Sequence, residues 1–200
     1  MKILLLTFTL IFSMSTHLNA DHLKDDLLRI HATLIPKILM MDYDFKDRLV
    51  DNEISIAVVY ENHPQKNDAV IIKRYFEAKY PDGFQNHKIN IEFIAYDVIR
   101  SAKKHTLYYL LPSSEKQIKN VLAISQKQKA ISFSYRGEDL KYGVMLSVKI
   151  SNKVKPIINV DALKQTNVTL RPVLLKVADI FYQTSSLSLK NYDQYSLHIL

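Results

Sequence analysis

Reactive centres are commonly built from cysteine, serine, histidine and paired acids. In this chain the first is absent, and the spacing of the others argues against such a centre. The 200 residues include no cysteine, which excludes disulfides, thiolate nucleophiles and cysteine metal sites. No serine stands in a Gly-x-Ser-x-Gly turn, and Asp42, Asp44 and Asp47 are expected to form a solvated turn rather than a catalytic pair. The seven histidines never recur at metal-site spacing; they are His17, His22, His31, His63, His87, His105 and His198. We therefore expect no enzyme activity, no metal and no cofactor.

Polar residues follow several of the apolar segments that are expected to be strands. In an open α/β sheet, ligands bind in the crevice beyond the carboxyl ends of the strands. That rule predicts a rim for a ligand or a partner, built by Asn62, Tyr96, Ser113, Ser114 and Arg136. Two interpretations of the serine pair stay open. Backbone N–H groups at a helix start could bind a phosphate or carboxylate there, or the serine could simply cap the helix, which is the interpretation we favour.

Tyrosine supplies possible anchors for a protein partner, because 12 tyrosines are many for this length and tyrosine favours interfaces. The candidates are Tyr96, Tyr135 and Tyr142, which stand near expected strand ends. Packing in the core is the alternative role for each of them. Asn159 follows an apolar strand and precedes a helix, where its amide could bridge backbone groups or contact a ligand. We expect the structural role for Asn159.

Helical and strand periods alternate along most of the chain, which predicts an α/β fold. The expected architecture is a single three-layer domain with a mixed, mostly parallel sheet, a C-terminal antiparallel hairpin and helices on both faces. The helices are expected at Leu27–Leu39, Asp68–Lys79 and from Ser113 to about Gln126, with Lys116 and Lys119 exposed on the last of these. The strands are expected at Ile54–Tyr60, Ile89–Ala95, Thr106–Leu111 and Ala130–Tyr135.

The last third of the chain changes character. Alternating apolar residues in Tyr142–Ile150 and in Val154–Asn159 predict the antiparallel hairpin. Pro156 cannot donate to a strand ladder, so we expect the second hairpin strand to lie at an edge or to begin irregularly. Helices are expected at Val160–Gln165 and Pro172–Tyr182, and the pattern is weak from Gln183 onward.

Residues 1–20 are typical of an export signal. Lys2 precedes an apolar run from Ile3 to Phe12, and a polar segment ends at Ala20, the expected cleavage position. Residues 21–200 then form the mature domain, and the loss of Lys2 lowers the formal charge from +7 to +6. Export makes nucleic acid an improbable partner for this basic chain. Anionic lipid headgroups or an acidic protein face fit better.

The closing pattern of the chain resembles the YfiR-like family of periplasmic regulators. The resemblance rests on Gly143-Val144-Met145-Leu146, on Val154-Lys155-Pro156-Ile157-Ile158-Asn159 with Ala162, and on Val173-Leu174-Leu175-Lys176-Val177-Ala178. Within it, Gly143 and Asn159 belong to the structural motif. The resemblance implies a small exported α/β protein. It also implies restraint of a membrane-bound diguanylate cyclase from the periplasmic side, which lowers cyclic di-GMP and biofilm formation.

Three departures limit that implication. The family's Trp-Pro pair is replaced by residues 41–45 without tryptophan, its paired glycines are Tyr142-Gly143 here, and its redox-responsive disulfides have no cysteines to form them. Two functions are therefore expected. One is a periplasmic regulator that binds the sensor part of a membrane signalling protein, a diguanylate cyclase or receptor kinase, and could act as a homodimer. The alternative is a stand-alone solute-binding domain whose small ligand is unknown.

Overall fold

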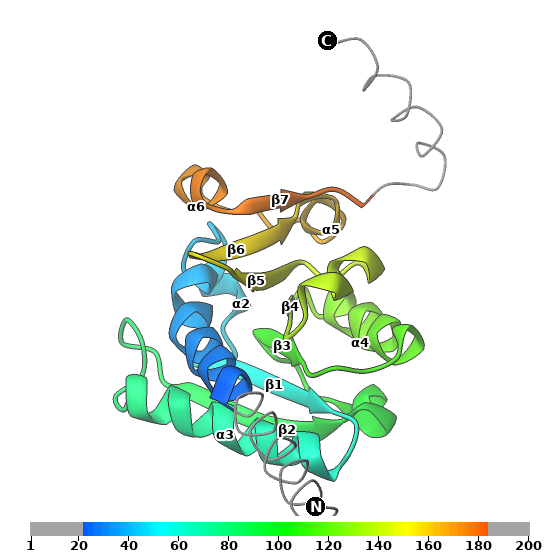
Figure 1. The fold of residues 1–200 in the computed structure, drawn as a ribbon. Coiled ribbons are helices and arrows are strands. Elements are labelled where there is room, and N and C mark those ends of the chain that lie inside the picture. Colours follow the sequence, from blue (N-terminus) through cyan, green and yellow to red (C-terminus); the bar gives the residue numbers. More distant parts are fainter. Residues whose placement is uncertain (1–21, 184–200) are drawn as a thin grey trace, which may run out of the picture.

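A seven-stranded sheet organises the protein, whose computed structural model describes residues 22–183 (Figure 1). The strand order is β2-β1-β3-β4-β5-β6-β7. The strands are β1 (Ile54–Tyr60), β2 (Ile89–Ala95), β3 (Leu107–Leu110), β4 (Ile131–Ser134), β5 (Leu146–Ile150), β6 (Val154–Asn159) and β7 (Asp179–Phe181). All neighbouring pairs are parallel except β5–β6, which is antiparallel. The mixed, mostly parallel sheet with a C-terminal hairpin is confirmed.

Helices cover both faces of the sheet, which makes three layers (Figure 1). One face carries the N-terminal helix (residues 22–39), α2 (Phe45–Arg48), α3 (His63–Lys79) and α6 (Pro172–Val177). The other face carries η1 (Tyr96–Ser101) and α4 (Glu115–Lys127). Two further short helices are η2 (Gly137–Tyr142) and α5 (Val160–Gln165).

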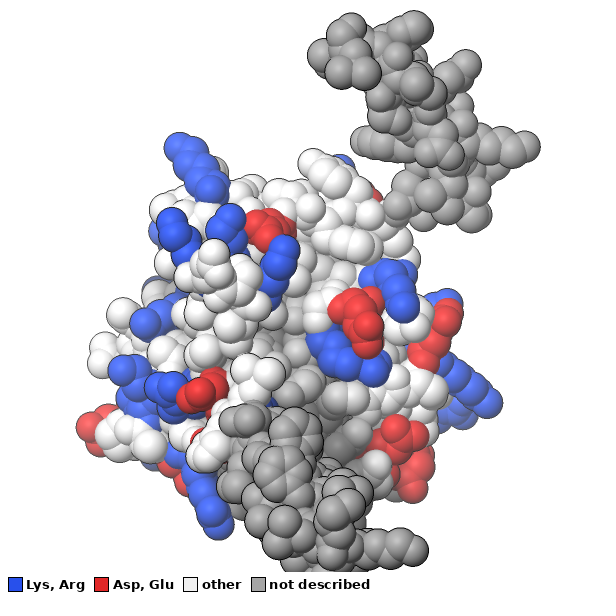
Figure 2. Space-filling model, viewed as in Figure 1, with Lys and Arg blue, Asp and Glu red and all other residues white. Residues whose placement is uncertain are grey.

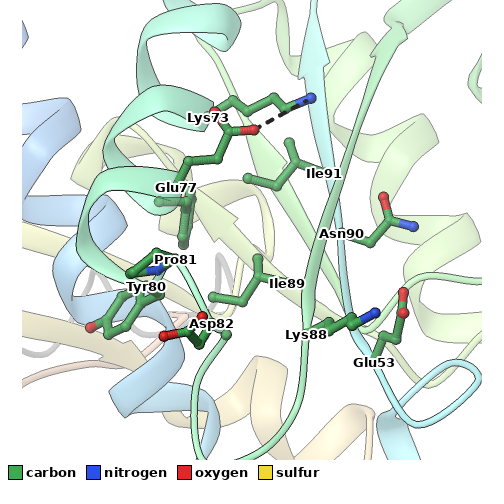
Figure 3. Close-up of a pocket in the computed structure, with 12 residues that line it drawn as sticks. Glu53, Lys73, Glu77, Tyr80, Pro81, Asp82, Lys88, Ile89, Asn90 and Ile91 are labelled. Atoms are coloured by element: carbon green, nitrogen blue, oxygen red, sulfur yellow. Dashed lines mark ion pairs between the residues drawn. The ribbon is translucent and has the colours of Figure 1, made fainter.

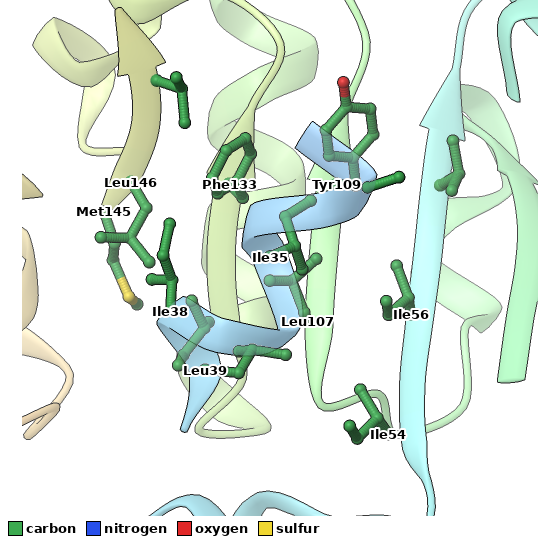
Figure 4. Close-up of a cluster of buried hydrophobic side chains, with 14 of the residues drawn as sticks. Ile35, Ile38, Leu39, Ile54, Ile56, Leu107, Tyr109, Phe133, Met145 and Leu146 are labelled. Atoms are coloured by element: carbon green, nitrogen blue, oxygen red, sulfur yellow. The ribbon is translucent and has the colours of Figure 1, made fainter. Parts of the chain in front are cut away.

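The two cores follow from side-chain alternation along the strands. In β1, Ile54, Ile56 and Val58 face the N-terminal helix, whereas Ala57 and Val59 face α4. The larger core holds Ile35, Ile38 and Leu39 of the N-terminal helix against Tyr109, Phe133 and Leu146 of the sheet (Figure 4). Because β1 is buried on both faces, its sequence is a nearly continuous apolar run, as the pattern predicts.

Helix α3 begins earlier than its hydrophobic pattern predicts. The structure starts it at His63 rather than Asp68. Asn62 is the N-cap, its side chain accepting from the backbone N–H of Gln65, and Pro64 sits in the first turn, where its missing N–H costs nothing. This polar first turn lies ahead of the apolar face, so helical periodicity could not detect it.

The last strand corrects two expectations about the C-terminal third. The helix expected at Pro172–Tyr182 ends at Val177, and Asp179–Phe181 forms β7 instead. Pairing with β6 decides this, since Ile180 lies opposite Ile158 in a parallel ladder. Strand β6 is therefore interior, not an edge strand. Pro156 is tolerated on both sides. Opposite Val148 it occupies a pair of the β5–β6 ladder that exchanges no hydrogen bonds, and β7 pairs only from Ile157 onward.

The hairpin itself is confirmed, although β5 starts at Leu146 rather than Tyr142. Gly143, at φ +105°, ends the short helix η2 in a left-handed conformation that favours glycine. Within the described residues, no helix is long and apolar enough to span a bilayer. The expected signal segment, residues 1–20, and the tail beyond Gln183 lie outside the described residues.

Candidate functional site

The carboxyl ends of β3 and β4 meet at an ion pair that closes the predicted rim. Arg136, just after β4, donates from Nη2 to Asp139 Oδ1 at 2.8 Å and to the carbonyl of Ser113 at 3.0 Å. Asp139 is fully buried, and its other oxygen accepts from Ser134 Oγ at 2.5 Å. The guanidinium therefore ties the loop after β3 to the loop after β4. Most of its polar capacity is used inside the protein.

Two of the predicted rim residues are helix caps. Asn62 Oδ1 accepts from the N–H of Gln65 at 3.1 Å, and Ser114 Oγ accepts from the N–H of Gln117 at 3.4 Å. Gln65 also donates to the carbonyl of Pro112 at 2.7 Å, which joins the start of α3 to the loop before α4. The simpler interpretation of Ser114, a side-chain N-cap, matches this geometry.

Ser113 differs from the other rim residues. Its Oγ is buried and has no hydrogen-bond partner within the described chain. Buried hydroxyls are normally paired, and a pairing would here have to come from a ligand or from water. Ser113 Oγ is thus the rim oxygen that the described chain leaves unpaired.

The three tyrosines lie in different surroundings. Tyr96 is 2% exposed and donates its hydroxyl to the carbonyl of Leu111 at 2.7 Å, and burial raises its pKa above the ordinary range. Tyr135 is half-buried against His31 on the face of the N-terminal helix, with 5.9 Å between ring centroids. Tyr142, at the end of η2, has the Lys141 ammonium 4.9 Å from its ring centroid and interacts electrostatically with Arg136. Tyr96 and Tyr142 thus lie near the Arg136–Asp139 pair, whereas Tyr135 lies on the other face of the sheet.

Asn159 occupies the structural position that its sequence context suggests. It is fully buried, donates from Nδ2 to the carbonyl of Leu140 at 2.9 Å, and accepts at Oδ1 from the N–H of Ala162 at 3.0 Å. These bonds cap α5 and hold it against η2. Both amide atoms are used, so the side chain has no free group to offer a ligand in this conformation.

A second buried ion pair, at the amino end of the sheet, corrects an expectation. Asp42 is buried and pairs with Arg48, so it does not belong to a solvated turn. Arg48 also donates to the carbonyl of Lys129 at 2.6 Å. These contacts join α2 to the turn before β4. Sequence reasoning missed the pair because nothing local shows that Asp42 is buried while its neighbours Asp44 and Asp47 stay exposed.

Several open hollows lie among the described residues, and two of them involve segments that the sequence did not bring together. One, about 510 Å³, runs between the second half of α3 and the edge strand β2, where Lys73 and Glu77 face Ile89 and Ile91 (Figure 3). The other, about 810 Å³, lies between α4 and α5 and includes Tyr142 and Gly143. Both depend on contacts between distant segments, which have no local signal. Among the described residues, no cluster of three His, Cys, Asp or Glu side chains could hold a metal ion.

Comparison with solved structures finds the same fold in proteins of low sequence identity. A conserved domain protein from Vibrio cholerae O1 biovar El Tor is 16% identical with a TM-score of 0.55, and the match covers 76% of this chain and 59% of that one. The ABC domain from Streptococcus pneumonia, in complex with L-Trp, is 14% identical with a TM-score of 0.51 over 72% of this chain and 62% of that one. A substrate-binding protein with adhesive properties from Clostridium difficile is 13% identical with a TM-score of 0.51 over 70% and 58%.

The match thus spans about three fifths of each of those chains, and at such identity it establishes the fold alone. No curated protein matches the sequence. A family model, described as YfiR/HmsC-like, matches residues 53–179, which run from the start of β1 to the start of β7. That range holds the sheet, the rim and the C-terminal hairpin. The chain belongs to the YfiR/HmsC-like family.

Proposed function

We propose that this protein acts in the periplasm as a regulator. It would bind the periplasmic sensor part of a membrane signalling protein, a diguanylate cyclase or a receptor kinase, and modulate its output. The observation that carries the proposal is the family match over residues 53–179. Processing after Ala20 and a homodimeric state belong to the same proposal.

The polar groups of the rim make structural contacts rather than a catalytic arrangement. A catalytic site needs a nucleophile or a proton-transfer group poised beside a reacting atom. At the rim, Arg136 and Asp139 pair with each other, and Asn62 and Ser114 cap helices. No nucleic acid is expected to bind, because the chain is proposed to be exported.

An affinity capture experiment tests the regulatory function. The purified protein, with its N-terminus read by mass spectrometry, is immobilised and exposed to solubilised membranes of the source cell. We expect enrichment of a membrane cyclase or a receptor kinase, and then saturable binding of its isolated periplasmic domain. A bait that is folded by circular dichroism yet captures neither would contradict the proposal.

A second candidate function, binding of a small solute, is favoured by one observation. Ser113 Oγ is buried without a partner beside the first turn of α4, where exposed backbone N–H groups attract anions. Two of the similar structures are a domain in complex with L-Trp and a substrate-binding protein, so this fold also serves small-molecule binding. A thermal-shift screen of metabolites tests it. A true ligand should raise the melting temperature of the wild type but not that of Ser113→Val, which fills the hydroxyl's space.

A further inference from the structure

The C-terminal third leaves five aliphatic side chains exposed on the side of the sheet that β5, β6 and β7 form. Their exposed fractions range from 38% to 59%, which is unusual for valine and isoleucine. They come from the hairpin, from α6 and from β7. We call them the aliphatic patch: Ile150, Val154, Val173, Val177 and Ile180.

The strand residues of the patch share one face of the sheet. Ile150 lies opposite Val154 in the hairpin, and Ile180 lies opposite Ile158. Ile158 packs in the larger core, with Val148 two residues before Ile150, so this is the face of the N-terminal helix. Helix α6 packs on β6 from the same side and buries Leu174 there. Its Val173 and Val177, one turn apart, remain in solvent.

Exposure follows from the short helix above these strands. The strands β1, β3 and β4 are covered by helices of 13 or 17 residues and by the N-terminal helix, whereas α6 has six residues. Six residues make fewer than two turns and cannot reach the tip of the hairpin. The larger core therefore ends before Ile150 and Val154.

Two lysines lie beside the aliphatic patch: Lys153 in the turn of the hairpin and Lys176 on α6. Lys149 and Lys155 alternate with Ile150 and Val154 along the strands, so they project from the opposite face of the sheet. One acid, Asp179, serves both Lys155 at 3.3 Å and Lys149 at 3.7 Å. Within the described chain, Lys153 and Lys176 have no acidic partner. Figure 2 shows basic side chains gathered in its upper left, in the region where Figure 1 places α6 and the turn between β5 and β6.

This composition separates a lipid surface from a protein surface. Protein interfaces are enriched in Tyr, Trp and Arg and depleted in Lys at their core. Protruding aliphatic side chains beside Lys153 and Lys176 fit a membrane instead, where the side chains enter the headgroup boundary and the ammonium groups meet anionic phosphates. We propose that the aliphatic patch docks this protein on an anionic lipid bilayer. Docking would hold the rim and the rest of the domain beside membrane-bound partners.

The proposal stands apart from the regulatory function, because a chain without any protein partner would still bind vesicles. Co-sedimentation with liposomes tests it, using the purified protein with its N-terminus read by mass spectrometry. This reading matters because a retained leader would itself bind lipid. We expect binding to phosphatidylcholine vesicles that contain phosphatidylglycerol. Pure phosphatidylcholine vesicles should bind far less, and salt should weaken the binding to anionic vesicles.

Variants assign the binding to the patch. Lys153→Glu should weaken vesicle binding by more than about fivefold, the effect expected for the loss of one lysine at an anionic surface, because the charge is reversed. Val177→Asp should weaken it further, and Val177→Leu should preserve it. Lys116→Glu is the matched control, since Lys116 is also exposed but lies on α4, on the other face of the sheet. Circular dichroism establishes that each variant is folded.

Three outcomes would overturn the proposal. Equal binding to neutral and anionic vesicles, or none to either, would remove the electrostatic argument. An equal loss in Lys116→Glu would show that overall charge, rather than the patch, drives binding. If the protein is a dimer in sedimentation and Val177→Asp makes it a monomer without changing vesicle binding, the patch is an interface between two copies.

Discussion

The two halves of the sheet end very differently. At the carboxyl ends of β3 and β4, Arg136 and Asp139 lock the loops together, and the neighbouring helix starts are capped by Asn62 and Ser114. At the hairpin and β7, by contrast, valines and isoleucines stand in solvent. The first region has polar groups that are mostly satisfied internally, and the second has apolar groups that are not.

This difference shows where a partner could gain binding energy. A satisfied polar group offers little to a newcomer, because each new bond replaces an existing one. Exposed aliphatic surface still has hydration to lose, which favours association in proportion to the area covered. The rule for α/β folds favours the rim as a binding site, but the polar groups of the rim mainly stabilise the folded protein. The C-terminal third is better placed for contact.

Removal of Arg136 should have the largest effect on stability. Arg136→Ala leaves the buried Asp139 carboxylate with only Ser134 as a side-chain donor, which costs about 3 to 5 kcal/mol of unfolding free energy. Urea denaturation measures this cost. Glu138→Gln is the control, because the exposed Glu138 also pairs with Arg136, at 3.4 Å, yet should change stability by less than about 1 kcal/mol. Equal effects in both variants would break the contrast between a closed rim and an open patch.

Asn159→Ala should rank second, with a loss of about 2 kcal/mol. The substitution removes the cap of α5 and leaves the buried carbonyl of Leu140 without this donor. The loss is read from thermal unfolding. We expect the fraction of partner bound by a saturating concentration of folded variant to stay close to that of the wild type, although the melting temperature falls. A variant with wild-type stability that no longer binds its partner would show that Asn159 belongs to a binding surface.

Acid should destabilise the larger core through His31. This side chain is fully buried between the N-terminal helix and the sheet, with Nδ1 2.8 Å from the hydroxyl of Tyr109, and burial lowers its pKa to about 3. The folded-state pKa lies below the unfolded value. Its contribution to stability is therefore complete above pH 6.5 and is lost as the pH falls towards 3, by about 1.4 kcal/mol for each unit at most.

Comparison of the wild type with His31→Gln isolates that slope. Unfolding in urea is followed at pH 7.5, 6.0 and 5.0, and the wild type should lose more stability than the variant between pH 6.0 and 5.0. His105 also has a lowered pKa, mainly from burial, and it contributes the same slope to both proteins. If the unfolding free energy depends on pH in the same way in both proteins, the core around His31 is accessible to water, which would contradict its burial in this half of the sheet.

Most of the fold could be predicted because its signals are local. The continuous apolar run of β1 reflects a strand that is buried on both faces. The helical spacing of Ile118, Val121 and Leu122 reflects a helix that is buried on one face. The end of the last helix at Val177 could not be predicted. The residues of β7 fit a helix and a strand alike, and only the ladder of Ile180 with Ile158, a contact between distant segments, decides between the two.

The sequence could predict where the rim residues lie, but not which partners their side chains contact. Strand ends place Ser113 and Arg136 at one edge, as expected, but the sequence does not show that the Arg136 guanidinium is occupied by Asp139. Nor could it show the exposure of Val173 and Val177. Their spacing suits a helix that packs on the core, and only the shortness of α6 and the orientation of Leu174 turn them outward. Local patterns predict which elements form, whereas exposure depends on what lies above them.

The smallest expected effect tests the covered half from its solvent side. Ile118 and Val121 of α4 are buried, which places Lys116 and Lys119 outward, and both are exposed as predicted. The double variant Lys116→Glu, Lys119→Glu loses one ion pair, between Lys119 and Glu115 at 2.5 Å, and creates like charges one turn apart. Exposed pairs of this kind are worth about 0.5 kcal/mol, so the melting temperature should fall by only a few degrees. A loss of stability as large as that of Arg136→Ala, measured by the same urea denaturation, would mean that α4 covers its face of the sheet in another orientation.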